Sequence, residues 1–381
     1  MEFVGGPTRT GPTMERITFM VSRVTFASAR PRELRAEATL PALLDKMMDQ
    51  WNFKKRFAGK RVAIKMHLGG GNGYSTIHPY FVGRVVHAVR QAGGDPFVTD
   101  TAHGVAHARP RGYTPETLGA PLVAVAGPAD KYVYSRRTNF RSLKTVELAG
   151  SIVDAGAMIV LSHGKGHGQS GFGGAIKNIA MGCVNEATRK KIHRLMESAF
   201  VHDAAKCTRC MLCRDNCPNG AITLADGKIE IFDHHCKYCM HCVLACPNKA
   251  ITIDQGGYRY FQRGMALTVR ETLAALKPQN VFYVTVLLAV TPFCDCWGMT
   301  TPSIVPDIGI VAGDNIVAVE TASLDLIRAK DFIKGSLPPP MKRTGKGHLL
   351  QQIHGKDPYL QIEECIAVGL GKPKYKLEQI E

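Results

Sequence analysis

Eight of the twelve cysteines fall between residues 207 and 246 and repeat one spacing twice. In each block two gaps of two residues separate the first three cysteines, and a fourth follows after three residues and precedes a proline. The two blocks are Cys207, Cys210, Cys213 and Cys217, then Cys236, Cys239, Cys242 and Cys246. Soft thiolate sulfur is the ligand that iron–sulfur clusters select. The pattern predicts two [4Fe–4S] clusters. Zinc, which paired C-x-x-C motifs also bind, is the alternative.

The doubled run resembles that of bacterial two-cluster ferredoxins, in which the fourth cysteine of each block ligates the other cluster. The resemblance implies one cluster on Cys207, Cys210, Cys213 and Cys246, and another on Cys236, Cys239, Cys242 and Cys217. The sequence after each block also repeats, Pro-Asn-Gly-Ala-Ile-Thr at 218–223 answering Pro-Asn-Lys-Ala-Ile-Thr at 247–252. Such repetition is typical of a duplicated half-unit.

A second stretch that can do chemistry spans 162–178 and is dense in glycine, histidine and lysine. Glycine lets a backbone approach a ligand closely, and histidine carries protons near neutral pH. The alternative is a flexible loop with solvated lysines. We expect a catalytic role for His163, Lys165, His167 and Lys177, and cofactor contacts from Gly171, Gly173 and Gly174.

Further polar residues and thiols follow apolar segments that read as strands. Ligands bind at the carboxyl ends of strands in open α/β sheets, so these residues outline a site. We expect Lys65, His67, Gly71, Asp100, Cys294 and Cys296 to contact a cofactor. For Gly71, in the loop 69–73, a simple turn is the alternative. Cys294 and Cys296 can ligate a metal, form a redox pair or accept electrons, or be buried structural cysteines.

The elements that must position these residues alternate between strand and helix. Strands are predicted at 16–24, 61–68, 96–101, 121–126, 157–162, 281–290 and 307–312. Helices are predicted at 33–57, from 79, and at 262–277, 320–334 and 359–369. The order predicts an α/β fold, a mostly parallel sheet flanked by helices, with an inserted two-cluster ferredoxin (α+β) domain. The expected segments are a disordered leader 1–15, an α/β domain at 16–200 and 256–381, and the insert at 201–255.

The composition indicates a globular protein with a basic surface. The formal net charge is +16, and the chain contains no apolar run long enough for a membrane span. No nucleic-acid-binding motif accompanies the charge. We therefore expect an acidic electron donor or acceptor protein of the ferredoxin or flavodoxin type, or an anionic small molecule, as partner. The alternative is a basic surface that serves solubility alone. Eight cysteines needed as thiolates, without an export signal, favour a reducing, low-oxygen cytoplasm.

Motifs along nearly the whole chain resemble the iron–sulfur centre proteins of domain-of-unknown-function family 362. They are Val62-Ala-Ile-Lys65, Phe97-Val-Thr-Asp-Thr101, Gly171-Phe-Gly-Gly-Ala-Ile-Lys-Asn178, Met181-Gly-Cys183, Cys294-Asp-Cys296 and Pro306-Asp-Ile-Gly-Ile310, together with the cysteine block. The resemblance implies a two-cluster ferredoxin inserted in an α/β domain. That family has no settled reaction.

A local pattern is similar to nickel-dependent lactate racemase. The matching positions are His167, Gly171, Phe172, Gly173, Lys177 and His193. This resemblance implies a nucleotide-type cofactor tethered at Lys177 and a metal ligated by His193. Ile176 departs from the racemase pattern, which has arginine there. In the alternative, Lys177 pairs with a core carboxylate and His193 caps a helix.

Together these features predict an iron–sulfur electron-transfer oxidoreductase. Two [4Fe–4S] clusters would pass low-potential electrons to a Gly/His/Lys-rich active site on the α/β domain, with a further metal or nucleotide-type cofactor as a second expectation. The alternative function is a non-catalytic redox module or cofactor-maturation factor that docks on a larger enzyme. A third interpretation is non-redox chemistry with structural clusters.

Overall fold

The computed structural model describes residues 21–196, 200–225, 228–231, 236, 238–339 and 341–381. The leader expected at 1–15 and the start of the strand expected at 16–24 lie outside the described residues. The described helices include none that is both long enough and apolar enough to cross a membrane.

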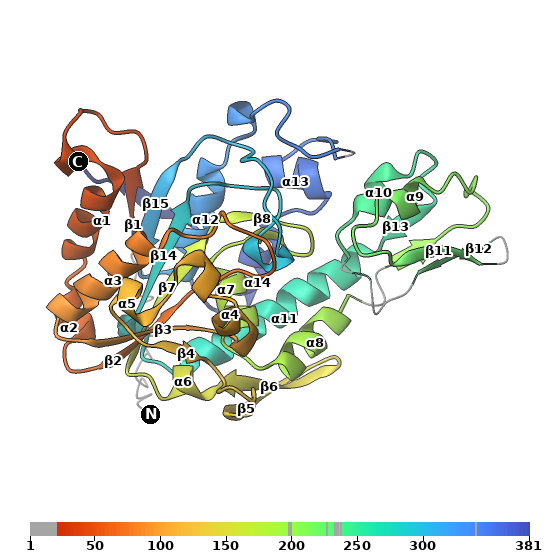
Figure 1. Cartoon of the computed structure of the whole chain (residues 1–381). Coiled ribbons are helices and arrows are strands. Elements are labelled where there is room, and N and C mark those ends of the chain that lie inside the picture. Colours follow the sequence, from red (N-terminus) through yellow and green to blue (C-terminus); the bar gives the residue numbers. More distant parts are fainter. Residues whose placement is uncertain (1–20, 197–199, 226–227, 232–235, 237, 340) are drawn as a thin grey trace, which may run out of the picture.

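An eight-stranded sheet forms the centre of the molecule (Figure 1). Its spatial order is β16 (Tyr375–Gln379), β1 (Ser22–Ser28), β15 (Gly309–Gly313), β14 (Val281–Leu287), β7 (Ala157–His163), β2 (Arg61–Lys65), β3 (Asp95–Asp100) and β4 (Leu122–Ala124). Only β15 runs antiparallel to its neighbours, and every other pairing is parallel. The mostly parallel α/β sheet predicted from the sequence is confirmed.

The central strands are apolar throughout because helices cover both faces of the sheet. In β14, Phe282 and Val284 join the core on one face, whereas Val281 and Tyr283 join the core on the other. This alternation is the expected two-residue period of a strand, and burial on both faces explains the unbroken apolar run. One face carries α1 (Leu40–Asp49), α2 (Phe53–Phe57) and α3 (Pro79–Gln91); the other carries α7 (Ala175–Gly182), α11 (Gln255–Ala274), α12 (Ile316–Leu326) and α14 (Leu360–Ala367).

The helix expected at 33–57 is divided in the structure. Asn52 adopts a left-handed backbone conformation with φ of 48° and its side chain accepts the N–H of Lys55, which begins α2 as a new helix. Asparagine tolerates this conformation better than most residues, so the break has a local cause. The structure also contains a hairpin, β5 (Val133–Phe140) with β6 (Leu143–Ala149), that the sequence interpretation did not include.

The remaining elements are short. The helices are α4 (Ala102–Ala106), α5 (Pro115–Leu118), α6 (Gly150–Val153), α8 (Glu186–Arg194) and α13 (Leu349–His354), with 3-10 helices at Ala36–Ala38, Arg109–Arg111, Pro278–Asn280, Asp295–Trp297 and Ala329–Asp331. A two-stranded sheet joins β8 (Lys165–His167) to β9 (Gly171–Gly173).

Residues 200–253, here called the cysteine lobe, project from the sheet domain (Figure 1). The lobe closes on itself because its first strand, β10 (Phe200–His202), pairs with its last, β13 (Ile251–Ile253). Between them lie α9 (Leu212–Asp215), the hairpin β11 (Ile222–Ala225) with β12 (Lys228–Ile231), and α10 (His241–Ala245). A small core of its own contains Cys213, Ile222, Ile229 and Ile251.

Candidate functional site

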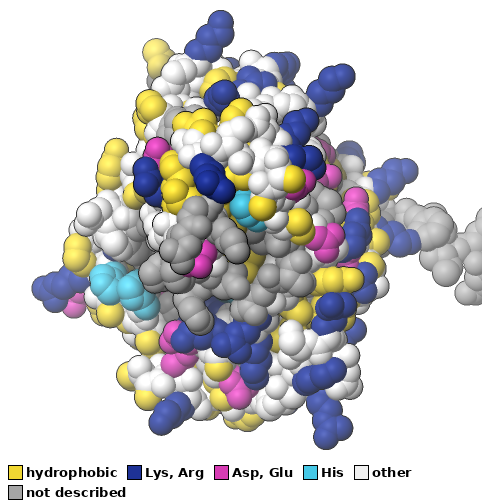
Figure 2. Space-filling model, turned by 90° about the vertical axis from the view of Figure 1, so that its right-hand side faces the viewer, with side chains coloured by type: hydrophobic (Ala, Val, Ile, Leu, Met, Phe, Trp, Pro, Cys, Tyr) yellow, Lys and Arg dark blue, Asp and Glu magenta, His cyan; other side chains and the backbone are white. Residues whose placement is uncertain are grey.

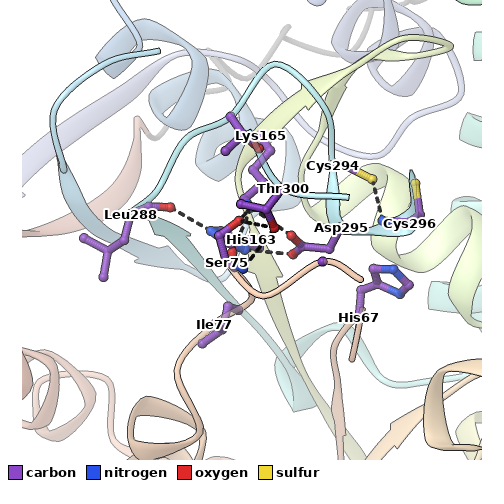
Figure 3. A network of polar contacts seen from close by, with 12 residues as sticks. His67, Ser75, Ile77, His163, Lys165, Leu288, Cys294, Asp295, Cys296 and Thr300 are labelled. Atoms are coloured by element: carbon purple, nitrogen blue, oxygen red, sulfur yellow. Dashed lines mark hydrogen bonds and ion pairs between the residues drawn. The ribbon is translucent and has the colours of Figure 1, made fainter. Parts of the chain in front are cut away.

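The candidate site lies where four strands of the sheet end. Lys65 ends β2, Asp100 ends β3 and His163 ends β7. His67 follows β2, and the loop after β14 carries residues 294–296 (Figure 3). The connections lead from β2 outward to β3 and β4, and then return to β7 on the other side of β2. Ligand sites of open α/β sheets form at such a reversal of strand order, so this edge of the sheet is a favourable position.

Asp100 organises the first of two polar networks. Its Oδ1 accepts from Lys65 Nζ at 3.1 Å, and its Oδ2 lies 3.0 Å from both His67 Nδ1 and the backbone nitrogen of Leu68. Lys65 Nζ also donates to Asn178 Oδ1 at 2.8 Å. Both Lys65 and Asp100 have side chains only 1% exposed, whereas His67 is 32% exposed. Its Nε2 has no hydrogen-bond partner among the described residues. We call this the open network.

Charge pairing sets the protonation of the open network. Burial would raise the pKa of Asp100, but Lys65 and His67 outweigh it and hold that pKa well below its ordinary range. Burial would likewise lower the pKa of His67, and the Asp100 carboxylate raises it above the ordinary value instead. Asp100 is therefore a carboxylate that orients His67 and favours its protonated form.

Asp295 organises the second network with the same residue types. Its Oδ1 accepts from Lys165 Nζ at 2.8 Å, and its Oδ2 lies 2.8 Å from His163 Nδ1. Lys165 Nζ also donates to the carbonyl and hydroxyl oxygens of Ser75, each at 2.8 Å. His163 Nε2 lies 2.7 Å from the carbonyl oxygen of Leu288 (Figure 3). Because every polar atom of His163 is engaged, we call this the closed network.

The closed network is a buried charge cluster. Lys165 is 1% exposed and Asp295 7%. Burial would raise the pKa of Asp295, but His163 and Lys165 outweigh it and lower that pKa far below its ordinary range. His163 faces an acceptor at each ring nitrogen, so both nitrogens donate. The catalytic roles expected for His163 and Lys165 stay predictions, and the geometry favours positioning of the loop that follows β14.

Two thiols, an amine and an imidazole meet beside these networks. Lys177 Nζ, on α7, lies 3.5 Å from Cys296 Sγ and 3.7 Å from Cys294 Sγ. His167 Nε2, on β8, lies 3.3 Å from Cys296 Sγ. Cys294 is buried and Cys296 is exposed. The sequence placed these four residues in one site, and the structure brings them together.

The orientation of His167 fixes its tautomer. Its Nδ1 accepts the backbone N–H of Gln169 at 3.0 Å and that of Ser170 at 3.1 Å. Burial, and then the charge of Lys177, lower the pKa of His167 to about 4. The ring is therefore neutral at neutral pH with its proton on Nε2, which donates toward Cys296 Sγ.

The environments of the two thiols shift their pKa values in opposite directions. Burial and the adjacent Cys296 raise the pKa of Cys294 above that of an ordinary thiol. A hydrogen bond from Cys294, together with Lys177, outweighs burial and lowers the pKa of Cys296 to about 6. Cys296 is thus the thiolate of the pair and Cys294 the neutral thiol.

His167, Cys294 and Cys296 lie within 4.8 Å of one another, which is close enough to hold a metal ion. The clustering of cysteines in this chain indicates a metal or iron–sulfur cofactor. At this trio, however, two contacts oppose an ion. A ligating histidine normally donates its other ring N–H, whereas His167 Nδ1 accepts two hydrogen bonds. The ammonium of Lys177 also stands against both sulfurs. The geometry favours a hydrogen-bonded thiol site.

The glycines of 171–174 serve close packing around the site. A Cβ on Gly173 would lie 3.4 Å from Cys294 Cβ and 3.7 Å from Lys177 Cδ, so Gly173 lines the thiols. Gly171, with φ of +80°, packs on Pro358. A Cβ on Gly174 would lie 2.4 Å from Glu320 Oε2. An oxygen of the Glu320 side chain in turn accepts the N–H of Ala175 at 2.7 Å. Glu320 therefore occupies the position at the amino end of α7 where an anionic ligand could otherwise bind.

The loop 69–73 is held by backbone contacts. The N–H of Asn72 donates to the carbonyl of Gly298 at 2.7 Å, and a Cβ on Gly71 would lie 2.7 Å from that same oxygen. Arg111 Nη2 donates to the carbonyls of Gly70 and Gly71, each at 2.7 Å. These contacts favour the simple turn over a phosphate-binding loop, and the cofactor contact expected of Gly71 stays a prediction.

His193 contacts Gln169 and Phe261. Its Nδ1 is 3.3 Å from Gln169 Nε2, and its ring stacks on Phe261 with centroids 5.5 Å apart. The metal ligation expected from the racemase pattern stays a prediction.

The eight cysteines of the lobe line two separate hollows. One is lined by Cys207, Cys210, Cys213 and Cys246, and the other by Cys217, Cys236, Cys239 and Cys242. Each hollow thus takes three cysteines from one block and the fourth from the other. Matching left-handed residues precede and follow the second cysteine of each block: Arg209 and Met211, then Tyr238 and Met240. These tight turns let successive sulfurs face one hollow. The soft donor set fits an iron–sulfur cluster in each.

The second hollow borders the candidate site. A Cβ added to Gly168, the neighbour of His167, would lie 3.0 Å from Cys239 Cβ. Lys356, buried, donates to the carbonyl oxygen of Gly168 at 2.6 Å and to that of Tyr238, between Cys236 and Cys239. We call Cys217, Cys236, Cys239 and Cys242 the proximal quartet, and Cys207, Cys210, Cys213 and Cys246 the distal quartet.

An aromatic contact joins the lobe to the loop after β14. The ring of His241, which precedes Cys242, lies 5.4 Å between centroids from Phe293. Phe293, which precedes Cys294, lies 5.1 Å from Trp297. The loop after β14 therefore packs against the lobe through Phe293.

The sequence interpretation missed Asp295, Asn178 and Lys356. Asp295 stands between Cys294 and Cys296 and could have been found as the acidic residue inside the Cys-Asp-Cys motif. Asn178 follows Lys177 by one residue. Lys356 gives no local signal, because its role depends on a lobe more than a hundred residues away in the chain.

Comparison with known proteins supplies a family. No curated protein matches the chain. A solved structure to which it is similar is the "lactate racemase apoprotein from Thermoanaerobacterium thermosaccharolyticum", with 9% identity and a TM-score of 0.32 over 70% of this chain. The match spans 51% of that racemase chain, about half of its length, and a likeness at this level carries no argument about chemistry. A family model matches residues 62–325, and the chain belongs to the family described as domain of unknown function (DUF362).

Proposed function

We propose that the protein is an iron–sulfur electron-transfer oxidoreductase whose active site is the thiol group at the edge of the sheet. The cysteine-rich lobe supports a metal or iron–sulfur cofactor. The grouping of its eight cysteines into two quartets favours two [4Fe–4S] clusters. When bound, such clusters supply one-electron transfer.

The observation that carries the proposal is the packing of Cys239 against Gly168. It puts the proximal quartet beside the residue that follows His167 and hence beside the thiols. Lys356 holds both loops through their carbonyl oxygens, so the separation between quartet and site is fixed by a buried side chain. A docking module without chemistry of its own would not need this contact between the proximal quartet and the thiol site.

The distal quartet suits entry of electrons from a soluble protein. Cys210 is exposed, and Arg209, Leu212 and Arg214 beside it are exposed as well. Figure 2, which looks onto the side of the molecule where the lobe projects, shows Lys and Arg side chains around the margins of this face. With a net charge of +16, such a surface attracts an acidic donor protein, and this docking belongs to the proposal.

Anaerobic purification with metal and sulfide analysis tests the proposal. We expect about eight iron and eight sulfide per chain, with paramagnetic resonance signals of two clusters after reduction. Cys246→Ser should perturb the distal quartet's cluster, and Cys217→Ser the proximal one. A colourless zinc protein, or loss of the opposite cluster in these variants, would contradict the proposal.

Replacing Lys356 tests the contact between the proximal quartet and the candidate site. Lys356→Met removes a buried positive charge beside the proximal quartet, so we expect the reduction potential of that cluster to fall while the distal one stays unchanged. Lys334→Met, an exposed lysine of the sheet domain, is the matched control and should leave both potentials unchanged. Potentiometric titration followed by paramagnetic resonance measures the shift. Equal potentials of the proximal cluster in the Lys356 variant and the wild type would show that Lys356 does not link this quartet to the site.

A further inference from the structure

The surroundings of Cys296 are those of a nucleophilic thiolate. Three donors converge on its sulfur: the ammonium of Lys177 at 3.5 Å, the Nε2–H of His167 at 3.3 Å, and the neutral thiol of Cys294. Two of these donors come from elements distant in sequence, α7 and β8. Convergent donors of this kind stabilise a sulfur anion and lower the pKa of its thiol.

Charged and polar groups act on the ionisation of this sulfur in both directions. Lys177 and Cys294 favour the thiolate, and Asp295 opposes it. His167 donates a further hydrogen bond to the sulfur. Asp295 is already neutralised by Lys165 and His163 in the closed network. The closed network thus removes the one carboxylate that would otherwise disfavour a negative sulfur at Cys296.

Cys296 is also the thiol that a substrate can reach. Of the four cysteines outside the lobe, Cys183, Cys294 and Cys365 are buried and Cys296 is exposed. His67 lies beside the two thiols (Figure 3), and its charge interacts with those of Cys294 and Lys177. His67 Nε2 is buried and has no hydrogen-bond partner in the part of the chain that the structure describes, so it can donate to a group bound at Cys296.

We propose that Cys296 is the covalent nucleophile of this site and that its substrate is a disulfide, with His67 protonating the leaving thiolate. The choice of disulfide rests on the proposed electron-transfer function, because cleavage of a sulfur–sulfur bond takes two electrons and the lobe has two quartets. Thiolate attack on a disulfide sulfur is also the reaction for which soft sulfur is suited.

The chemistry balances in two steps. In the first, the Cys296 thiolate attacks one sulfur of R–S–S–R′, a bond forms between Cys296 Sγ and R–S, and R′–S⁻ leaves and takes the proton of His67. In the second, two electrons from the soluble donor protein and one proton convert the mixed disulfide to the Cys296 thiolate and R–SH, and a second proton from solvent restores His67. The donor is oxidised twice, by one electron each time, and the disulfide is reduced to two thiols.

Alkylation of the anaerobic, cluster-loaded protein tests the nucleophile. We expect iodoacetamide to label Cys296, located by peptide mass spectrometry, with a rate whose midpoint lies near pH 6. An ordinary thiol has its midpoint near about pH 8.5. Lys177→Met should move the midpoint up by about one pH unit or more. Cys296→Ser should abolish labelling, and Cys365→Ser, a buried core cysteine, is the control that should leave it unchanged.

An anionic aromatic disulfide, 5,5′-dithiobis(2-nitrobenzoate), tests the substrate class. We expect one equivalent of thionitrobenzoate to be released and an adduct on Cys296, which reduction of the clusters by dithionite then removes faster than dithionite acts on the unloaded protein. A midpoint near that of an ordinary thiol, or a metal ion on Cys294 and Cys296 that blocks labelling until chelation, would overturn the inference. Labelling near pH 6 in a protein that takes up no iron under anaerobic loading would overturn the proposed function instead. Loaded, reducible clusters with an inert Cys296 would overturn this inference alone.

Discussion

The open and closed networks use the same three residue types, and they differ in what the second nitrogen of the histidine contacts. In each, an aspartate binds a buried lysine with one oxygen and a histidine Nδ1 with the other. In the closed network the second histidine nitrogen donates to the carbonyl of Leu288. In the open network His67 Nε2 has no partner among the described residues. The shared part orients a ring, and the remaining nitrogen decides whether that ring can exchange a proton.

The comparison separates support from chemistry. His163 is held at both nitrogens, so its proton has no free position to leave from, and its effect is to fix the loop that carries the thiols. His67 keeps the same carboxylate support, but its buried Nε2 has no partner in the described part of the chain, which is the arrangement of an oriented acid or base. The closed network therefore stabilises the site, and the open network provides the group that can exchange a proton there.

Breaking the closed network should have the largest effect. Asp295→Asn leaves Lys165 and His163 buried without their counter-charge, and breaking one side of a buried ion pair costs about 3–5 kcal/mol. We expect the free energy of unfolding, measured by urea denaturation, to fall by about that amount. Asp314→Asn, whose partner Arg56 belongs to a half-exposed pair, is the control and should change it by less than about 1 kcal/mol. Equal effects of the two variants would contradict the difference in burial.

Replacing each histidine sharpens the comparison. His163→Gln cannot satisfy both Asp295 and the Leu288 carbonyl, so we expect it to lower the free energy of unfolding by about 1–3 kcal/mol. His67→Gln can still donate to Asp100 and should cost less than about 1 kcal/mol. Turnover of a disulfide substrate should show the opposite order, with a loss of about 100-fold or more in His67→Gln. Stability effects in the reverse order would remove the distinction between open and closed.

The pH dependence of stability should show the smallest effect. The lowered pKa values of Asp100 and Asp295 mean that both carboxylates stabilise the fold above the unfolded pKa near about 4, and that this contribution is lost as the pH falls further. The raised pKa of His67 works in the other direction. Its contribution is present below about pH 6.5 and is lost as the pH rises through the raised value.

Wild-type stability should therefore decline slightly as the pH rises through the neutral range, and His67→Gln should lack that decline. Urea denaturation at a series of pH values measures it, with the acid loss of stability as an internal standard shared by both proteins. A wild-type curve that stays flat or rises through neutral pH would show that His67 does not carry the charge assigned to it.

Local patterns in the sequence were sufficient for the strands and for the types of residue in the site. The apolar runs at β2 and β14 give strands, and the polar residues that follow them meet because parallel strands end at one edge. The partition of the cysteines followed from a resemblance. The bonds of single nitrogens could not be predicted, since the partner of His163 Nε2 is a carbonyl 125 residues away in the chain. The helix predicted at 33–57 was too long because Asn52, in a left-handed backbone conformation, separates α1 from α2.

The bridge made by Lys356 has a consequence for how the molecule is assembled. Its hydrogen-bond partners are two carbonyl oxygens, which carry no net charge, and the negative charge that faces it comes from Cys236, Cys239 and Cys242. Burial raises the pKa of the Cys239 and Cys242 thiols, so both are neutral without a cofactor, and an ammonium ion buried against neutral thiols is unfavourable. A negatively charged cluster on these sulfurs would stabilise the Lys356 ammonium, and with it the contact between the lobe and the body of the protein.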